Sequence, residues 1–357
     1  MNALAEWMGQ QLSKRPMPAS EFMALALYHP ELGYYRRQEG PWGFEGKDYY
    51  TALDCGPLLG ATLALRLEAA WERLDRPARF TVLEPGAGRG WLGRDLLAAS
   101  CGAFAEALVY VHQDDNPAAR RAAEQALAPF LASGRARFEG ESVADPFIGA
   151  VVSNELFDAL PAQPWRWDGQ AWLMEALSAE GPVWLPGDPG EAGAWFAAQA
   201  EEGLHPGDGS VWSEGLGPFV NRLGGRLQAG LFLAVDYGET AGRLLAKGAD
   251  LRRYHGHTVD GRWWEDPGTC DLTADVDFTR LSVELNALAF RVIAHESLSR
   301  WICRHAPLMD WEARWMELAE AERAQRMQNL MQLTLPGLMG ERFRVLEAWK
   351  DGPSQEA

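Results

Sequence analysis

The segment that decides the fold runs from residue 80 to residue 91 and reads Phe80-Thr81-Val82-Leu83-Glu84-Pro85-Gly86-Ala87-Gly88-Arg89-Gly90-Trp91. Its first five residues form an apolar run that ends in an acid, which predicts a buried strand. Glycines follow at every second position, and a helix is expected from about Trp91 to Ala99. Glycine at a strand-to-helix turn permits a tight turn and lets backbone N–H groups approach a ligand. The segment therefore predicts a ligand-binding loop.

Strands and helices alternate around this segment. The expected strands lie at residues 107–111, 137–139, 150–153, 230–238 and 343–346. The expected helices lie at residues 57–74, 117–131, 278–288 and 311–333. This alternation indicates an α/β fold with a doubly wound, mostly parallel sheet of the Rossmann-like type.

The alternation is interrupted after Pro161. The run Trp165-Arg166-Trp167-Asp168-Gly169-Gln170-Ala171-Trp172-Leu173 predicts a β-hairpin, because Asp-Gly stands between two alternating segments. We expect residues 161–213 to form an inserted β-rich cap, and residues 57–160 with 214–357 to form the Rossmann-like core with C-terminal helices. Residues 1–56 are expected to form an N-terminal helical segment that covers the cofactor.

Composition and charge exclude several classes of protein. The 357 residues carry a formal net charge of −17 without a compensating Lys/Arg cluster, so we expect no nucleic-acid partner. No apolar run is long enough to span a bilayer, so we expect no membrane partner. The four cysteines form no CxxC pair, which argues against a disulfide framework and a zinc knuckle. Without a recognisable targeting pattern, the expected location is the cytoplasm.

Two glycine registers overlap in the loop. Gly86, Gly88 and Gly90 follow Glu84 in the pattern E-x-G-x-G-x-G, whereas Gly88, Gly90 and Gly93 spell the dinucleotide pattern G-x-G-x-x-G. The dinucleotide register begins four residues beyond the strand end, which is late for its tight first turn. Glu84 stands where a carboxylate can meet the positively charged methionyl part of S-adenosyl-L-methionine (SAM). SAM is therefore favoured over a dinucleotide.

The second strand ends at Asp114, which is placed to accept hydrogen bonds from both ribose hydroxyls of a cofactor. This acid does not separate the two cofactor classes, because dinucleotide-binding proteins place an acid similarly. Glu84, Gly86, Gly88, Gly90 and Asp114 are accordingly the candidate cofactor-binding residues.

Polar residues also follow the strand at 150–153, where Asn154, Glu155 and Asp158 are the candidate catalytic residues. The carboxyl ends of strands line the ligand crevice of a doubly wound sheet. A carboxylate there can hold a guanidinium or amine and take up the proton released on methylation. The structural alternative is a helix N-cap at Asn154 followed by early acids.

The sequence does not predict a metal site. Across the whole chain the acids are too dispersed, and the histidines too irregularly spaced, to form one.

Several motifs taken in order resemble the MidA family, which is similar to the mitochondrial complex I assembly factor that methylates a protein arginine. They are Phe22-Met23, Leu27-Tyr28-His29-Pro30, Gly33-Tyr34-Tyr35, Asp48-Tyr49-Tyr50-Thr51, Glu84 to Gly90, Asn154-Glu155-Leu156-Phe157-Asp158-Ala159-Leu160-Pro161, Asp236-Tyr237-Gly238 and Asp271-Leu272-Thr273-Ala274-Asp275-Val276-Asp277-Phe278. The resemblance covers about Phe22 to Leu346. It departs from the family at Asp114-Asp115-Asn116-Pro117 and at His295 to Trp301, and the second departure affects the acceptor site.

The resemblance implies a Rossmann-like class I methyltransferase that uses SAM and releases S-adenosylhomocysteine. It adds Tyr35 and Thr51 to the cofactor-binding residues, and it implies methylation of a protein side-chain nitrogen, foremost arginine. Two alternatives stay open, a methyltransferase acting on a small molecule and a non-catalytic SAM-binding assembly factor. The sequence does not indicate the oligomeric state.

Overall fold

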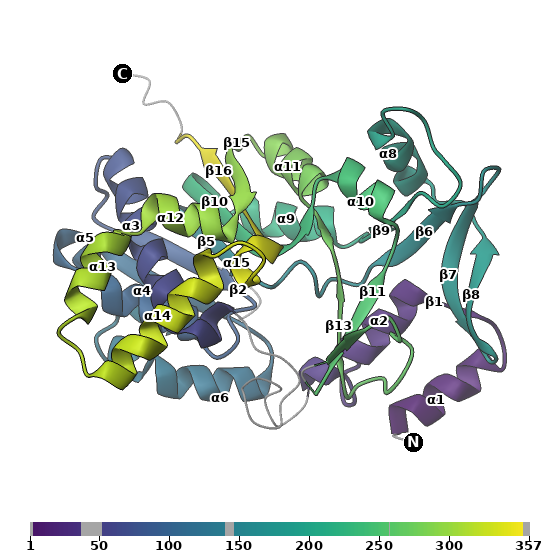
Figure 1. Cartoon of the computed structure of the whole chain (residues 1–357), viewed down its shortest axis with the longest axis horizontal. Coiled ribbons are helices and arrows are strands. Elements are labelled where there is room, and N and C mark those ends of the chain that lie inside the picture. The colour runs from purple at the N-terminus through teal and green to yellow at the C-terminus, as the bar shows by residue number, and fades with distance from the viewer. Residues whose placement is uncertain (1–2, 37–51, 140–145, 257, 353–357) are drawn as a thin grey trace. The chain divides into compact units, whose positions relative to one another are not determined.

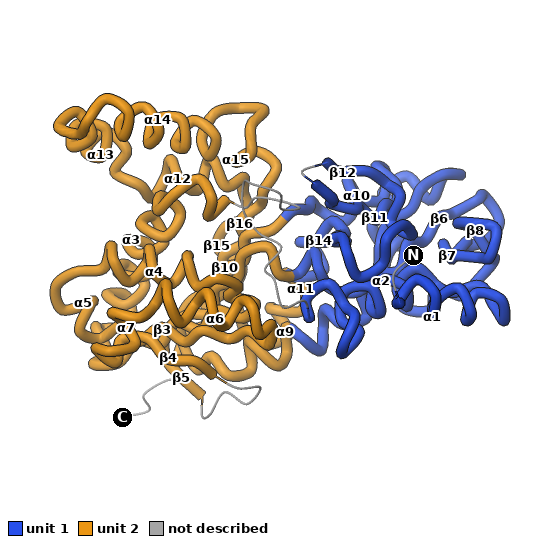
Figure 2. The backbone as a smooth tube through the Cα atoms, turned by 90° about the horizontal axis from the view of Figure 1, so that it is seen from below, with its two compact units in different colours: residues 1–49, 157–219, 237–281 blue, residues 50–156, 220–236, 282–357 orange. Residues whose placement is uncertain are grey.

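The computed structural model describes residues 3–36, 52–139, 146–256 and 258–352. The chain divides into two compact units (Figure 2). Unit 1 consists of residues 1–49, 157–219 and 237–281, and unit 2 consists of residues 50–156, 220–236 and 282–357. The expected cap, residues 161–213, thus lies in unit 1 together with most of the expected N-terminal segment. Each unit is described by itself below.

Unit 2 is built on the predicted sheet, whose strands run in the order β15-β16-β10-β5-β2-β3-β4. The strands are β2 (Phe80–Pro85), β3 (Leu108–Gln113), β4 (Ala136–Phe138), β5 (Phe147–Asn154), β10 (Leu227–Glu239), β15 (Arg291–Ser297) and β16 (Phe343–Lys350). The neighbours β4-β3-β2-β5-β10 pair in parallel, and β15 pairs antiparallel with β16. Every residue of β2 is buried, as expected for a central parallel strand. This confirms the α/β fold with a mostly parallel sheet.

Helices precede, connect or follow these strands, as can be traced by colour from purple to yellow in Figure 1. They are α3 (Leu58–Arg73), α4 (Trp91–Ala99), α5 (Gly102–Ala107), α6 (Pro117–Ala126), α7 (Ala128–Ala132), α9 (Leu216–Gly224), α11 (Phe278–Ala287), α12 (Leu298–His305), α13 (Leu308–Trp315), α14 (Glu320–Thr334) and α15 (Met339–Arg342). Two single helices expected from the sequence, 117–131 and 311–333, are each two helices. The order of strands reverses at β2, which has β3 on one side and β5 on the other. Such a reversal opens a crevice at the carboxyl ends of the strands.

Unit 1 contains two small antiparallel sheets. One has the order β1-β7-β6-β9 with β8 on β7, and the other has the order β12-β11-β13. Their strands are β1 (Met17–Pro18), β6 (Gln163–Trp167), β7 (Trp172–Ser178), β8 (Gly181–Pro186), β9 (Gly209–Trp212), β11 (Leu251–His255), β12 (Thr258–Asp260) and β13 (Asp271–Ala274). The predicted hairpin is present, because β6 pairs antiparallel with β7 across Asp168 and Gly169.

Helices and aromatic residues fill the cores of unit 1. Helices α1 (Ala3–Leu12) and α2 (Ala19–Tyr28) bury Leu4, Met8, Phe22 and Met23 in one apolar cluster with residues of β13. A second cluster contains Trp165 and Trp172, together with Phe196 of α8 (Glu191–Gln199) and Leu245 of α10 (Ala241–Lys247). The tryptophans of the cap therefore serve mainly as packing residues of this cluster.

The acidic segment after Cys270 forms two strands before the next helix. It forms β13 and then β14 (Val276–Asp277), which pairs with the end of β10. The helix begins only at Phe278, where Asp277 Oδ1 accepts a hydrogen bond from the backbone N–H of Arg280 over 3.0 Å. The side chain of Asp277 thus caps this helix, and Asp271 lies in a strand.

Candidate functional site

The glycine loop has the backbone that its sequence predicts. Gly86, Gly88 and Gly90 have φ angles of +64°, +49° and +69°, values that L-residues with a Cβ rarely adopt. Gly90 is the residue before α4 and takes the left-handed conformation. A Cβ placed on Gly88 would meet no described atom within 4 Å, so the loop presents open space at this residue. The backbone N–H groups of Ala87, Gly88 and Gly90 donate within the protein, so the loop offers a ligand the open space at Gly88.

Glu84 ends the strand before the loop and is buried. Its Oε2 accepts a hydrogen bond of 2.6 Å from the hydroxyl of Tyr110, while Oε1 accepts none among the described residues. Burial raises the pKa of Glu84 to about 8, although the Tyr110 hydrogen bond opposes the rise. A cation brought to this carboxyl would favour its ionised form. Glu84 therefore fits a positively charged cofactor group.

Asp114 lies just beyond the end of β3, and both of its oxygens are engaged. Oδ2 accepts from the backbone N–H of Gly88 and Oδ1 from that of Asn116, each over 2.8 Å. Burial raises the pKa of Asp114, and these two backbone donors counteract it. A carboxylate has about four acceptor positions, so two remain for a ligand. Asp114 thus fixes the glycine loop, a role the sequence did not predict.

Asn154 and Glu155, two of the candidate catalytic residues, lie together at the end of β5. Asn154 Nδ2 donates to Glu155 Oε1 over 3.0 Å, and Asn154 Oδ1 is buried without a hydrogen-bond partner among the described residues. Glu155 has a φ of +51°, a strained value for a residue with a side chain. Strain of this kind is often found at functional sites.

The N-cap interpretation of Asn154 is wrong, because no helix follows it. The chain continues in turns, and the backbone N–H of Leu156 donates to Oδ2 of the fully buried Asp236 over 3.0 Å. Asp236 ends the part of β10 that belongs to unit 2. Asp236, which belongs to one of the motifs of the family resemblance, thus holds the backbone after Glu155.

Asp158, the third candidate catalytic residue, belongs to unit 1 and has its own surroundings there. Burial raises the pKa of Asp158 to about 7, with Arg252 opposing the rise and Asp275 adding to it. Arg252 Nη1 lies 2.6 Å from Asp275 Oδ1. The backbone oxygen of Asp158 also accepts from the N–H of Ala274 in β13 over 2.9 Å. Asp158 is therefore a buried acid poised to titrate near neutral pH.

The two remaining cofactor-binding candidates have different outcomes. The hydroxyl of Tyr35, in the short 3-10 helix η1 (Tyr34–Arg36), donates to Asp271 Oδ1 over 2.9 Å, and its ring lies 5.6 Å from that of Tyr28. Thr51 lies outside the described residues. No group of three or more His, Cys, Asp or Glu among the described residues is arranged to hold a metal ion.

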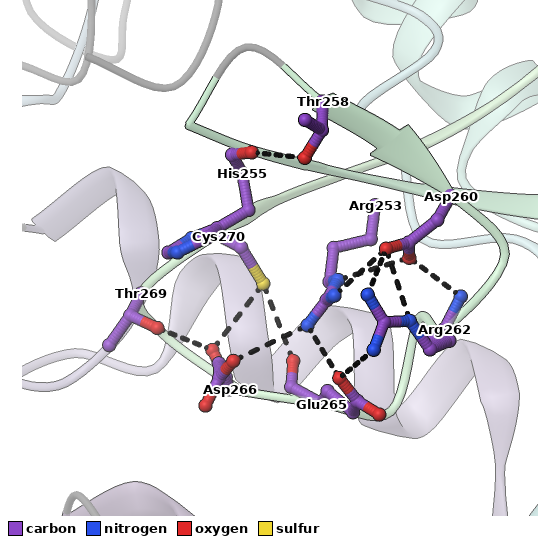
Figure 3. Close-up of polar contacts among 9 residues, drawn as sticks. All are labelled: Arg253, His255, Thr258, Asp260, Arg262, Glu265, Asp266, Thr269 and Cys270. Atoms are coloured by element: carbon purple, nitrogen blue, oxygen red, sulfur yellow. Dashed lines mark hydrogen bonds and ion pairs between the residues drawn. The ribbon is translucent and has the colours of Figure 1, made fainter. Parts of the chain in front are cut away.

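The segment that leads to Asp271 is held by Arg253 (Figure 3). This nearly buried guanidinium contacts three acids, Asp260 at 2.9 Å, Glu265 at 3.1 Å and Asp266 at 3.3 Å. The Cys270 thiol donates to the backbone oxygens of Glu265 and Asp266, each over 3.4 Å. Together these contacts fix the chain between β12 and β13.

Comparison with known proteins identifies the family. Residues 62–293 match the model of a family described as "Putative S-adenosyl-L-methionine-dependent methyltransferase". The chain belongs to this family. The match confirms the resemblance noted in the sequence, and SAM rather than a dinucleotide is the cofactor of the family.

Two mitochondrial proteins named protein arginine methyltransferase NDUFAF7 or its homolog are among the curated relatives. The one from Drosophila melanogaster is 27% identical over 297 residues, which are 75% of this chain and 66% of the relative. The one from Danio rerio is 26% identical over 74% of this chain and 68% of the relative. The match thus spans about two thirds of each relative's length. The expected cytoplasmic location is wrong by this comparison, because these relatives are mitochondrial proteins.

A solved structure from Burkholderia thailandensis, bound to S-adenosyl-homocysteine, has the same fold. It superposes with a TM-score of 0.82 at 25% identity and covers 98% of this chain and 92% of its own. The predicted Rossmann-like methyltransferase fold and the SAM cofactor are thereby confirmed. Among the described residues, no helix of this methyltransferase is long and apolar enough to cross a membrane.

Sequence reasoning missed Tyr110, His112 and Arg252. Tyr110 and His112 stand four and two residues before Asp114, so a search of β3 for side chains on the same face as Asp114 would have found them. Arg252 gave no signal, because only folding brings β11 to the polar group at Asp158 and Asp275.

Proposed function

We propose that this methyltransferase transfers the methyl group of SAM directly to a nitrogen of a protein side chain, with arginine as the foremost acceptor. The proposal is supported by the relatives named protein arginine methyltransferase. The observation that carries it is the pair Asn154 and Glu155. Asn154 Oδ1 has no hydrogen-bond partner among the described residues, and Nδ2 of the same amide bonds the carboxylate of Glu155, whose backbone is strained. Amide and carboxylate oxygens suit a guanidinium, which is a donor only.

The residues assigned to the cofactor are Glu84, Gly86, Gly88, Gly90 and Asp114, with Tyr35 and Thr51 added by the family resemblance. The open space at Gly88 and the uncommitted oxygen of Glu84 fit a cationic ligand lying over the loop. When bound, SAM supplies an electrophilic methyl group on a sulfonium. Glu84 would accept a hydrogen bond from an ammonium group, and Asp114 would use its remaining acceptor positions for hydroxyl groups.

Three residues are assigned to the acceptor. Asn154 and Glu155 would hold the guanidinium and orient one nitrogen for attack, which lowers the entropic part of the barrier. Asp158 would take the proton that methylation releases, because a pKa near neutral suits a general base. The assignments of Asn154 and Glu155, which belong to unit 2, do not depend on that of Asp158, which belongs to unit 1.

The test is transfer of tritiated methyl groups from SAM into a native lysate, followed by amino-acid analysis for methylarginine. Asp158→Asn is expected to lose about 100-fold in transfer rate or more, since a positioned proton-transfer group contributes at least that much. Glu155→Gln is expected to lose about 100-fold, because a misplaced acceptor reacts that much more slowly. Both variants should bind S-adenosylhomocysteine as the wild type does. Glu106→Gln on α5 and Glu201→Gln, which replace exposed acids, are the matched controls.

Each other outcome favours a named alternative. Label in a small molecule instead of protein would show a small-molecule methyltransferase. Cofactor binding without transfer into any acceptor would show a non-catalytic assembly factor. Unchanged transfer in both variants would remove the roles given to Glu155 and Asp158, and methylation of a residue other than arginine would refute the acceptor.

A further inference from the structure

Side chains from one face of β3 hold the glycine loop. Successive residues of a strand point to opposite faces, so Tyr110, His112 and Asp114 share a face. Each of them makes a hydrogen bond to the segment from Glu84 to Gly88. Tyr110 and His112 are buried, with exposed fractions of 0% and 1%. Buried polar groups are costly unless they are satisfied, so the loop and β3 are matched to each other.

Tyr110 reaches Glu84 through a gap that a glycine provides. A Cβ on Gly93, in the first turn of α4, would lie 2.2 Å from Cζ of the Tyr110 ring. No residue with a side chain fits there while the ring keeps its place. The third glycine of the apparent dinucleotide register thus has a packing function, which explains why the register exists in a SAM-binding chain.

His112 and Asp114 hold the two polar backbone groups of Gly88. His112 Nε2 lies 2.9 Å from the carbonyl oxygen of Gly88, and because that oxygen only accepts, Nε2 carries the hydrogen. Asp114 Oδ2 accepts from the N–H of the same glycine. Burial lowers the pKa of His112, so the ring is neutral. Its charged neighbours are Asp114 and Arg120, and the ring of Phe138 lies 5.0 Å from its own.

We propose that Tyr110 and His112 are positioning residues of the cofactor site. Tyr110 holds the Glu84 carboxylate in the orientation that receives the cationic part of the cofactor, and His112 holds the peptide of Gly88. The inference rests on the assignment of this loop to SAM. Loops fixed before binding lose less conformational entropy when the ligand arrives, so both residues would raise affinity without touching the ligand.

A double-mutant cycle tests the role of Tyr110. S-adenosylhomocysteine affinity is measured by calorimetry for the wild type, Tyr110→Phe, Glu84→Gln and the double variant. Tyr110→Phe keeps the ring over Gly93, and we expect about tenfold weaker binding, the size of losing one hydrogen bond to a charged group. In the Glu84→Gln background the same change should have no further effect, because Tyr110 acts through Glu84.

The pH profile gives a second measurement. The Tyr110 hydroxyl lowers the pKa of Glu84, whereas burial and Asp114 raise it. Tyr110→Phe should therefore move the rise of affinity to higher pH, and Glu84→Gln should abolish this difference. Thr62→Val, which removes a buried hydroxyl that bonds only within α3, is the matched control. Equal losses in both backgrounds, or no loss at all, would overturn the inference for Tyr110.

Rescue by a conservative variant tests His112. His112→Gln can still donate a hydrogen bond to Gly88, whereas His112→Leu cannot. We expect backbone amide exchange at Gly88 to be about tenfold faster in the leucine variant and near the wild-type rate in the glutamine variant. Similar exchange in both variants would refute the role of His112.

The two proposals fail in different ways. Exchange needs no ligand, so it judges the positioning of the loop even if the protein binds no cofactor. A wild type without affinity for S-adenosylhomocysteine would contradict the proposed function. A wild type that binds, with Tyr110→Phe and His112→Leu both unchanged in affinity and exchange, would contradict only the positioning roles.

Discussion

Arg252 Nη1 lies 2.6 Å from Asp275 Oδ1, while Nε and Nη2 of the same guanidinium are buried with no hydrogen-bond partner among the described residues. Burial alone would raise the pKa of Asp275, but Arg252 and Lys247 keep it below its ordinary value. The pKa of Asp158 is raised by burial, and Arg252 opposes that rise. One cation thus acts on the protonation of two acids, one of which is the proposed base.

Arg252→Met should lower the free energy of unfolding relative to the wild type, and this difference should grow as the pH rises from about 5 to 8. Asp158 has a folded pKa above its unfolded one, so its contribution is present below pH 4 and is lost as the pH rises through about 7. Removing Arg252 raises this pKa further and carries the loss to higher pH. It also raises the pKa of Asp275, which then no longer stabilises the fold above pH 4. Urea unfolding across this range measures the difference.

The matched control for this prediction is Arg243→Met. Arg243 makes an exposed i,i+4 pair with Glu239, and such pairs contribute little. Its free energy of unfolding, plotted against pH, should run parallel to that of the wild type. A parallel curve for Arg252→Met as well would show that Arg252 does not control the two acids.

Arg253→Met should lower the free energy of opening the segment between β12 and β13 by about 2 kcal/mol. The reason is that a buried guanidinium and its hydrogen bonds to partly exposed acids are lost. The measurement is labelling of the buried Cys270 thiol, followed by mass spectrometry. Cys270 should react faster than in the wild type, while the exposed Cys101 and Cys303 react equally fast in both. Arg262→Met removes a more exposed member of the same network and should have a smaller effect. Unchanged protection of Cys270 would show that Arg253 does not fix this segment.

The central part of the fold was predictable because each strand and helix there has its own sequence signal. The apolar run before Gly86, the glycines at every second position and the acid at Asp114 are local features, and the loop appears at the expected residues. Parallel strands buried on both faces give long apolar runs, which are easily recognised. The split of the helix at 117–131 had a signal that the single-helix expectation overlooked, because Pro129 cannot continue a helix and stands in the first turn of α7.

Unit 1 was harder to predict because its three segments come from distant parts of the sequence. Asp271, for example, pairs in register with Tyr254 in a sheet that only folding assembles. The environment of Asp158 is equally non-local, because Arg252 and Asp275 lie about a hundred residues away. Local sequence patterns do not report such pairings, whereas they do report the carboxyl end of β5.

Gly93→Ala should destabilise the protein by about 1–3 kcal/mol, the usual cost of overpacking a core. The new methyl group would overlap the ring of Tyr110, a fully buried side chain. The measurement is the thermal unfolding midpoint. Gly9→Ala on the exposed side of α1 is the control with opposite sign, because its Cβ meets nothing and alanine favours a helix by up to about 1 kcal/mol. A stable Gly93→Ala variant would contradict the packing role of this glycine.

Gly88→Ala should weaken cofactor binding, whereas an equally strained alanine away from the loop should not. With a φ of +49°, alanine at this position costs about 1–2 kcal/mol of backbone strain, but its methyl group meets no described atom of the protein. Gly134→Ala, at a φ of +76° and equally open, carries the same strain away from the loop. Both variants should therefore show similar losses of stability, while only Gly88→Ala loses about tenfold or more in S-adenosylhomocysteine affinity, because its methyl group enters the space that the ligand needs. Equal affinities in the two variants would show that the cofactor does not approach the loop at Gly88.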